Sequence, residues 1–356
     1  MQINSQAEQC MRLLPEWAPQ EAVILAWPDA HTDWQPWLPA VRKVYLRIID
    51  QLNKAQTPVV LLIREAEIRE FQTHISSSAK VLLVKAVYND TWVRDYAFLS
   101  CKSPDGIQPI EFTFNGWGNK FEASKDNHIN QTVLADLCQL PLQSIPIVAE
   151  GGALEIDQQG HLLSTQFCLA NPQRNGPLSP ADYSQLFRQH LGATQFSILE
   201  NGHLAGDDTD GHIDTLVRFT PDKGLVIQSA YNRPEDLHFV GLKALVQECQ
   251  AALPEHKIWE LPLPFVLNKH GERLPASYAN FLITNQQILC PTYSEPEDTQ
   301  ALTIIKTAYP EHTIVPINCL PLVQQFGSLH CITMQVPVGT LKPEIMKNFS
   351  HGVAQL

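Results

Sequence analysis

The segment HIDTLVRFTPDKGLVIQS, residues 212–229, predicts a β-hairpin. Two apolar runs flank the turn sequence TPDKG, a pattern typical of antiparallel strands joined by a short connection. Upstream, Ser179 and Pro180 place a capping residue before a proline in the first turn, which predicts the start of a helix. The apolar strand FSILE (196–200) follows this helix. Helix, apolar strand, polar or glycine-rich connection and hairpin therefore form one structural unit.

The same unit recurs along the chain. Apolar residues at helical spacing predict further helices, and each is followed by an apolar strand and a hairpin or strand. The expected helices cover 38–55, 127–138, 235–252 and 297–308. The expected strands and hairpins are VVLLI (59–63), VLLVKAV (81–87), TWVRDYAFLS (91–100), IPIVAE (145–150), GGALEIDQQGHLLST (151–165), KIWELP (257–262), YANFLITNQQILCPTY (278–293) and HTIVPIN (312–318).

Two strands lack a hairpin partner of their own. These are EAVILAWP (21–28) near the N-terminus and LHCITMQVP (329–337) near the other end. Pairing them closes five strand–helix units into a ring and leaves fewer exposed sheet edges. We therefore expect a single α/β domain over residues 1–356, closed by its first and last strands. A doubly wound parallel sheet is the competing fold, but hairpins after each crossover do not suit it. The segment after about residue 338 has no role that the sequence indicates.

Composition limits the classes of partner. The 356 residues carry a formal net charge of -12, with 37 acids against 25 bases. Such a surface does not favour nucleic acid or anionic membranes, and it suits a small cationic molecule. The N-terminal segment lacks the basic start and apolar core of a signal peptide, and the eight cysteines are scattered without a CxxC pair. We therefore expect a cytoplasmic protein with reduced thiols. A homo-oligomer is compatible with the sequence.

Chemically reactive residues lie at the starts of equivalent strands. Asp95, Glu150, His212 with Asp214, and Cys331 all occupy this position in successive units. In a ring, equivalent strand ends face the central axis, so acids, a histidine and a cysteine should converge on one pocket. We expect Cys331 to be a nucleophile and His212 its acid/base partner. Taken singly, each has an ordinary alternative role, a buried core cysteine or a strand-end acid.

The acid-rich segment GDDTDGHID (206–214) allows a second interpretation. Its carboxylates and His212 are ligand types that divalent metals use. The segment lacks the calcium-loop spacing that ends in a bidentate glutamate, and Asp207 and Asp210 also fit a solvated turn. On a strand, His212 and Asp214 would share one face, which suits a base and an anchor for one ligand.

Six motifs occur together in a fixed order. They are WPDAHTDW (27–34), NDTWVRDYAF (89–98), FNGWGNKF (114–121), EGGALEID (150–157), TDGHID (209–214) and LHCITMQVP (329–337). As a set they resemble the agmatine deiminase family, related to bacterial-type peptidylarginine deiminases within the guanidino-group-modifying superfamily. The sequence departs from the family's usual motifs at Phe326-Gly327-Ser328-Leu329, at RDYAF (94–98) and at TQFC (165–168).

The resemblance implies a five-bladed, pseudo-symmetric α/β propeller built from ββαβ units around a central pocket. It implies Cys331 as nucleophile, His212 as general acid/base, and no metal or other cofactor. Asp95 and Asp214 correspond to the carboxylates that bind the guanidinium, Glu150 to a further acidic partner, and Trp92 to a tryptophan at the mouth of the pocket.

The expected reaction is deimination of agmatine through a covalent S-amidino-cysteine. We expect the substrate's distant ammonium to meet Asp208, and the buried acids to have raised pKa values before the cation binds. Arg94 should point away from Asp95, and Arg218 should lie well along the strand from Asp214, so neither would serve an α-carboxylate. The alternatives are a deiminase of peptidyl-arginine or another guanidino compound, a metal-dependent hydrolase, and a non-catalytic ring that binds polyamines or partner proteins.

Overall fold

The computed structural model describes residues 11–356, and their strands form five sheets. Each sheet contains an antiparallel pair and a strand in parallel pairing; the antiparallel pair is a hairpin in four sheets and joins β17 to β2 in the fifth. The strands, sheet by sheet, are β1 (Arg12–Leu13), β5 (Leu99–Ser103), β6 (Gly106–Thr113) and β7 (Gln143–Val148); β8 (Glu155–Ile156), β9 (His161–Thr165) and β10 (Gln195–Leu199); β11 (Val217–Thr220), β12 (Gly224–Gln228) and β13 (Lys257–Leu261); β14 (Leu282–Ile283), β15 (Gln287–Thr292) and β16 (Thr313–Asn318); β17 (Met334–Pro337), β2 (Gln20–Ala26), β3 (Val59–Ile63), β4 (Val81–Lys85) and β18 (Ala354–Gln355). The predicted recurring unit is confirmed, and the antiparallel pairs contradict a doubly wound parallel sheet.

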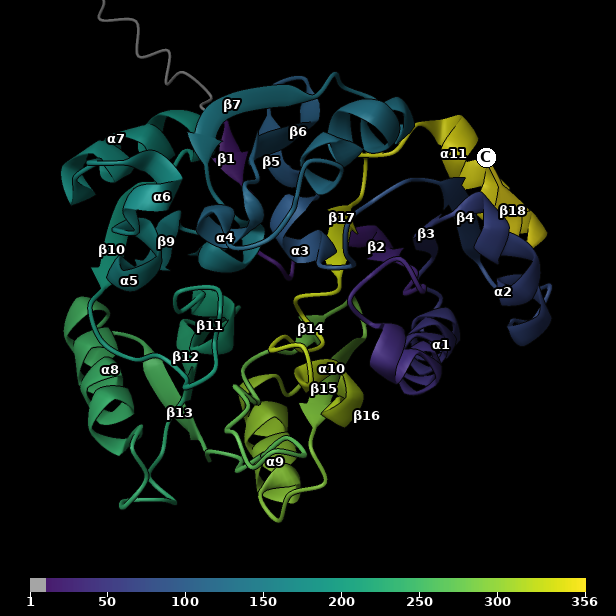
Figure 1. Cartoon of the computed structure of the whole chain (residues 1–356). Coiled ribbons are helices and arrows are strands. Elements are labelled where there is room, and N and C mark those ends of the chain that lie inside the picture. The colour runs from purple at the N-terminus through teal and green to yellow at the C-terminus, as the bar shows by residue number, and fades with distance from the viewer. Residues whose placement is uncertain (1–10) are drawn as a thin grey trace, which may run out of the picture.

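The two unpartnered strands pair with each other. β17 lies antiparallel to β2, with Met334 opposite Ile24 and Gln335 opposite Val23. Figure 1 shows the yellow β17 beside the purple β2, so an early and a late strand of the chain meet in one sheet. The same sheet receives β18, which runs parallel to β4 and gives a structural role to the segment after residue 338.

The helices connect the strands of each unit. Helix α1 buries Val41, Tyr45 and Ile48, which recur at the predicted spacing. Helix α7 begins with the predicted cap, because the Ser179 side chain accepts a hydrogen bond from the Asp182 amide. The helices are α1 (Leu38–Lys54), α2 (Ile68–His74), α3 (Val93–Tyr96), α4 (Gly116–Asn119), α5 (Gln166–Leu169), α6 (Pro172–Asn175), α7 (Pro180–Leu191), α8 (Phe239–Ala252), α9 (Asp298–Ala308), α10 (Leu320–Val323) and α11 (Pro343–Asn348). Every helix among residues 11–356 is too short or too polar to traverse a lipid bilayer.

Two local predictions were wrong. The helix expected over 127–138 is a run of short 3-10 and π turns, η3 (Asp126–His128), η4 (Asn130–Leu134) and η5 (Ala135–Leu137), rather than an α-helix. The strands expected from residues 91 and 329 begin later, at Leu99 and Met334. The residues before Leu99 instead form α3, in which the Asp95 amide bonds back to the Trp92 carbonyl. Tight turns ahead of the strands therefore carry the chemically reactive residues.

Candidate active site

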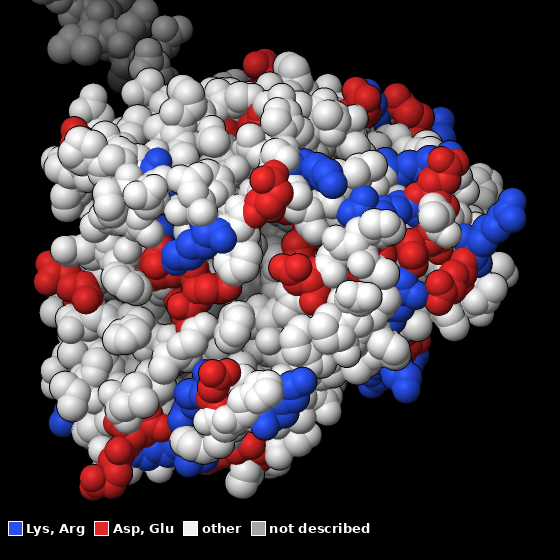
Figure 2. Space-filling model, in the orientation of Figure 1, with Lys and Arg blue, Asp and Glu red and all other residues white. Residues whose placement is uncertain are grey.

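A cavity of about 640 Å³ opens where several of these turns meet. Trp92, Asp95, Asp208, Asp214 and Cys331 all line it, so residues from distant parts of the chain share one space. Figure 2 shows acidic side chains around the hollow in this face of the molecule.

Cys331 lies in the turn between α10 and β17 and is 7% exposed. Its Sγ is 3.8 Å from Asp214 Oδ2 and 3.5 Å from Asn280 Oδ1. Burial, and then the carboxylates of Asp214 and Asp95, raise the pKa of this thiol well above its usual value. A positive charge entering the cavity would reverse the effect of those carboxylates and favour the thiolate.

Asp95 is fixed through both of its carboxylate oxygens. The Gly152 amide donates to Oδ1 at 2.9 Å, and the indole Nε1 of Trp117 donates to Oδ2 at 2.9 Å. Burial raises the pKa of Asp95, opposed by His212 and reinforced by Asp214 and Glu150. This carboxylate therefore fits the expectation of a raised pKa in the absence of a cationic ligand.

Asp214 lies in the 3-10 turn η7 (Ile213–Thr215) and is held on one side only. Its Oδ2 accepts hydrogen bonds from His330 Nδ1 at 2.7 Å and from Asn280 Nδ2 at 3.2 Å. Its Oδ1 is buried and has no hydrogen-bond partner among the described residues. Burial would raise the pKa of Asp214, but His330, His212 and Arg218 together outweigh burial and lower the pKa, contrary to the expectation from burial alone.

His212 is 1% exposed and lies between two carboxylates. Its Nδ1 is 3.5 Å from Asp95 Oδ1, and its Nε2 is 3.8 Å from Glu150 Oε2. Burial would lower the pKa of His212, but Asp95, Cys168 and Glu150 outweigh burial and raise it well above its usual value. A cationic imidazole at this position can give a proton to a departing group.

Gly152 leaves the space between these groups. A Cβ atom at this position would lie 2.7 Å from both Asp95 Oδ1 and His212 Nδ1, and 3.2 Å from Asp214 Oδ2. Real Cβ atoms do not approach other atoms so closely. The second glycine of the EGG motif therefore allows three catalytic candidates to approach one another.

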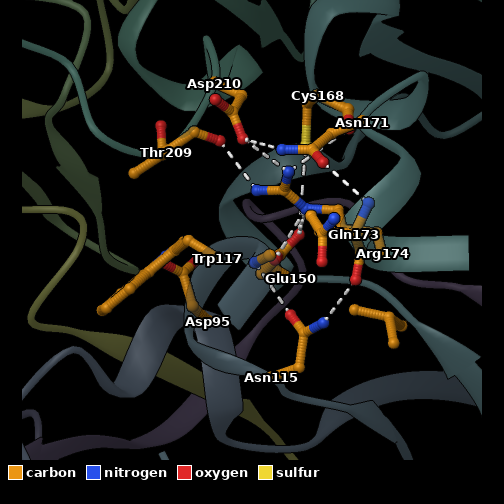
Figure 3. Close-up of polar contacts among 12 residues, drawn as sticks. Asp95, Asn115, Trp117, Glu150, Cys168, Asn171, Gln173, Arg174, Thr209 and Asp210 are labelled. Atoms are coloured by element: carbon orange, nitrogen blue, oxygen red, sulfur yellow. Dashed lines mark hydrogen bonds and ion pairs between the residues drawn. The ribbon is translucent and has the colours of Figure 1, made fainter. Parts of the chain in front are cut away.

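Glu150 does not line the cavity with the other expected acids. It is fully buried behind His212, where Arg174 Nε donates to its Oε1 and Oε2 at 2.9 and 3.0 Å. Figure 3 shows the Arg174 side chain extending from Glu150 toward Thr209 and Asp210, which it also contacts. Arg174 and His212 overcome the effect of burial and lower the pKa of Glu150, again contrary to the expectation.

The acid-rich segment distributes its carboxylates among separate contacts. Asp207 accepts from the amides of Thr209 and Gly211, and Asp210 pairs with Lys120 and Arg174. Asp207 and Asp208 both line the cavity, and of these two only Asp208 has a carboxylate without a hydrogen-bond or ion-pair partner among the described residues. Burial, and then Asp207, raise the pKa of Asp208 to about 7.

One group within residues 11–356 has metal-ligand geometry. Glu150, Cys168 and His212 each place one ligand atom within 4.8 Å of the others. A metal ion there would share Glu150 with the Arg174 guanidinium, whose positive charge opposes it. The group draws only His212 from the segment GDDTDGHID.

The remaining expected residues are also placed. Trp92 lines the cavity, packs against Trp34 at 5.3 Å between ring centroids, and would clash with any Cβ at Gly327. Arg94 and Arg218 point away from the cavity and both bind Glu16. Asp214 is not on the strand that carries Arg218, so the strand spacing between them does not apply.

Sequence reasoning did not assign roles to four contributors to the site, namely His330, Asn280, Cys168 and Arg174. Asn280 had a signal, because it occupies the same place in its unit as Asp95 and Asp214 do in theirs. His330 and Cys168 lie inside quoted motifs. No sequence pattern indicated Arg174. Its role comes from a tertiary contact, in which Arg174 on α6 donates a hydrogen bond to Glu150.

Comparison with known proteins adds to this geometry. The family model described as Porphyromonas-type peptidyl-arginine deiminase matches residues 12–337. The chain belongs to this family. The predicted resemblance to agmatine deiminases and bacterial-type peptidylarginine deiminases is therefore confirmed.

Named relatives of the family cover nearly the whole chain. A Yersinia pseudotuberculosis protein named "Putative agmatine deiminase" is 30% identical, over 90% of this chain and 94% of its own length. A C. jejuni agmatine deiminase with a cysteine-to-serine substitution, solved with substrate bound, is 28% identical, with a TM-score of 0.85 over 93% of this chain and 97% of its own. A Porphyromonas gingivalis structure titled "Putative Arginine Deiminase" is 37% identical, with a TM-score of 0.86 over 93% and 100%.

Proposed function

We propose that this protein is an agmatine deiminase, which hydrolyses agmatine to N-carbamoylputrescine and ammonia. The observation that carries the proposal is the Asp95–Asp214–Cys331 cavity with the cationic His212 beside it. Two carboxylates flank a buried thiol, an arrangement complementary to a planar cation with N–H groups on two sides. The relatives named as agmatine deiminases support the same substrate.

The first half-reaction joins substrate and enzyme. The guanidinium binds between Asp95 and Asp214, and its charge favours loss of the Cys331 proton to solvent. The thiolate attacks the guanidinium carbon, forming a C–S bond and a tetrahedral adduct. His212 gives its proton to the departing amino group, the C–N bond breaks, and ammonia leaves. An S-amidino-cysteine remains.

The second half-reaction consumes water. His212, now neutral, takes a proton from water, whose oxygen attacks the amidino carbon. The C–S bond breaks as the adduct's hydroxyl group loses its proton to solvent, the neutral ureido product leaves, and the Cys331 thiolate and the protonated His212 are restored. In this scheme Glu150 and Arg174 hold His212 from behind and do not contact the substrate.

The charge of the cavity supports agmatine over free arginine. Acids including Asp90, Asp126 and Asp208 line it, and Lys269 is the one Lys or Arg among the lining residues of the described chain. An ammonium fits this lining better than an α-carboxylate. Lys269 and the Porphyromonas gingivalis relative give arginine or a peptidyl-arginine as the second candidate substrate.

We further infer that the five sheets are the blades of a pseudo-symmetric α/β propeller, a single domain whose central pocket is the active site. The shared order of antiparallel pair and parallel strand in every sheet supports this, as does the β2–β17 pairing. In Figure 1 the sheets follow one another around the molecule in chain order.

The proposal is tested by ammonia release from agmatine, arginine and a blocked arginine peptide, with and without EDTA. We expect turnover of agmatine that resists EDTA and falls at least about a thousandfold in Cys331→Ser. Turnover of the peptide or arginine instead would keep the mechanism and change the substrate. Loss of activity with EDTA, together with full activity of Cys331→Ser, would contradict the thiol mechanism.

A further inference from the structure

His330 forms a buried bridge between two carboxylates. It is 1% exposed, and its Nδ1 lies 2.7 Å from Asp214 Oδ2 while its Nε2 lies 2.7 Å from Glu16 Oε1. A carboxylate accepts hydrogen bonds and does not donate them, so each ring nitrogen must carry a proton. An imidazole protonated on both nitrogens is a cation.

Glu16 anchors the far end of the bridge. It also binds the guanidinium groups of Arg94 and Arg218, and Gln335 donates to its Oε2 at 3.0 Å. The two arginines keep Glu16 ionised, because they outweigh the effect of burial and hold its pKa well below the usual value together with His330. Glu16 is therefore a fixed negative charge to which His330 can bind.

Asp214 receives the near end of the bridge. His330 and Asn280 both donate to Oδ2, while Oδ1 has no partner among the described residues and Asp214 lines the cavity. His330 thus fixes the rotation of this carboxylate, and Oδ1 keeps an unused acceptor site. We propose that His330 is a positioning residue, an imidazolium that connects Glu16 to Asp214 and turns Asp214 Oδ1 toward the guanidinium.

This inference rests on the proposed function, since it concerns the carboxylate assigned to the guanidinium. It also explains why His330 precedes Cys331 directly. Its backbone amide donates to Asn280 Oδ1 at 3.0 Å, and Cys331 Sγ lies 3.5 Å from the same oxygen. One asparagine therefore contacts the nucleophile, the bridge and Asp214, so a shift of His330 would move all three.

Two substitutions separate positioning from simple packing. The amide nitrogen of asparagine can occupy the place of Nδ1, so His330→Asn retains the donor to Asp214 and loses the one to Glu16. The longer glutamine places its nitrogen near Nε2, so His330→Gln retains the donor to Glu16 and loses the one to Asp214. Both remove the ring and its charge, and they differ from each other by one methylene group.

Agmatine binding is measured by calorimetry in the Cys331→Ser background, where the substrate is not consumed. We expect His330→Gln to raise Kd at least about tenfold, the loss of a hydrogen bond to a charged group, and His330→Asn to raise it much less. Equal weakening by both, or an unchanged Kd in His330→Gln, would overturn the positioning role. If the Cys331→Ser protein itself does not bind agmatine, the proposed substrate is wrong. The role of His330 is then decided by the ¹⁵N-histidine measurement described next.

A second measurement needs neither substrate nor a variant of His330. In ¹⁵N-histidine-labelled His212→Ala protein, one imidazole should carry a hydrogen-bonded proton on each ring nitrogen, because both nitrogens of His330 lie 2.7 Å from a carboxylate oxygen. If every histidine is neutral under these conditions, His330 is not the proposed imidazolium and the inference fails.

Discussion

Asp95 and Asp214, the two candidates for binding the guanidinium, differ in how many of their carboxylate oxygens already accept hydrogen bonds. Both oxygens of Asp95 already accept hydrogen bonds, from Gly152 and Trp117, whereas Asp214 Oδ1 has no partner among residues 11–356. Asp214 therefore keeps an unused acceptor site, whereas a ligand N–H must share the Asp95 oxygens. The close approach of Asp95, His212 and Asp214 also depends on the absence of a side chain at Gly152.

Gly152→Ala tests this fit. The new Cβ would lie 2.7 Å from Asp95 Oδ1 and from His212 Nδ1, so one of them must move. We expect kcat/KM for agmatine to fall roughly a hundredfold, as for other misplacements of about an ångström. Gly241→Ala is the control, because its Cβ meets nothing within 4 Å on helix α8 and alanine favours a helix. A fully active Gly152→Ala enzyme would contradict the geometry.

Asp208 should make substrate affinity depend on pH. Its pKa is raised to about 7, so it is mostly neutral at pH 6 and ionised at pH 8. Agmatine keeps its ammonium throughout this range, so KM should fall as pH rises through 7, by up to about tenfold. The inhibition constant of butylguanidine, which lacks the ammonium, serves as the control and should change less.

Asp208→Asn should flatten part of this KM profile. Asp90, whose pKa burial also raises to about 7, can supply the remainder. If Asp208→Asn has the wild-type profile, Asp208 does not bind the ammonium.

At the scale of the element, the turns before the strands carry the residues of the site, and the strands themselves do not. Asp95 lies on α3 and Asp214 on η7, while Gly152 lies on the 3-10 turn η6 (Gly151–Ala153). Their compact backbone brings side chains inward that an extended strand would turn alternately to its two faces. The hairpins behind them supply rigid supports.

Helix α7 supports the second of these units through its capping box. Ser179 accepts from the Asp182 amide, and Asp182 accepts from the Ser179 amide. We expect Ser179→Ala to lower the free energy of unfolding by about 1 kcal/mol. Ser184→Ala, inside the same helix, should change it much less, and kcat/KM should be unaffected in both. Equal stability of the two variants in urea would argue against the cap.

At the scale of the whole molecule, the second strand of the chain and its last two strands are built into one sheet. β2 pairs with β17, and β18 extends the edge beside β4. The last turn buries Phe349, which packs in the same core as residues of β2 and β3. The C-terminal segment therefore stabilises the sheet that brings Cys331 to the cavity.

Phe349→Ala tests this contribution. Loss of a buried phenylalanine typically costs about 3–5 kcal/mol, so the urea midpoint should fall markedly. Well below the unfolding transition, kcat/KM should remain near the wild-type value, because Phe349 does not line the cavity. Val338→Ala is the control, since Val338 is 56% exposed. A stable Phe349→Ala protein would show that the segment is dispensable.

The sequence by itself determined the order of the units, the hairpins and the pairing of the first and last strands. These features follow from apolar periodicity and turn residues, which act on the local backbone. The same order led to the grouping of Asp95, His212, Asp214 and Cys331, which the structure places together.

Only the tertiary structure decided how each charge is held. Glu150 lies behind His212 because Arg174 binds it there, and Asp214 is ionised because His330 donates to it. These pairs are 24 and 116 residues apart, and no periodicity links them. Burial alone predicts raised pKa values for all three acids, but the partners that packing supplies reverse the sign for two of them. Local patterns specify backbone shape, whereas electrostatic partners depend on which side chains the packed fold brings within hydrogen-bonding distance.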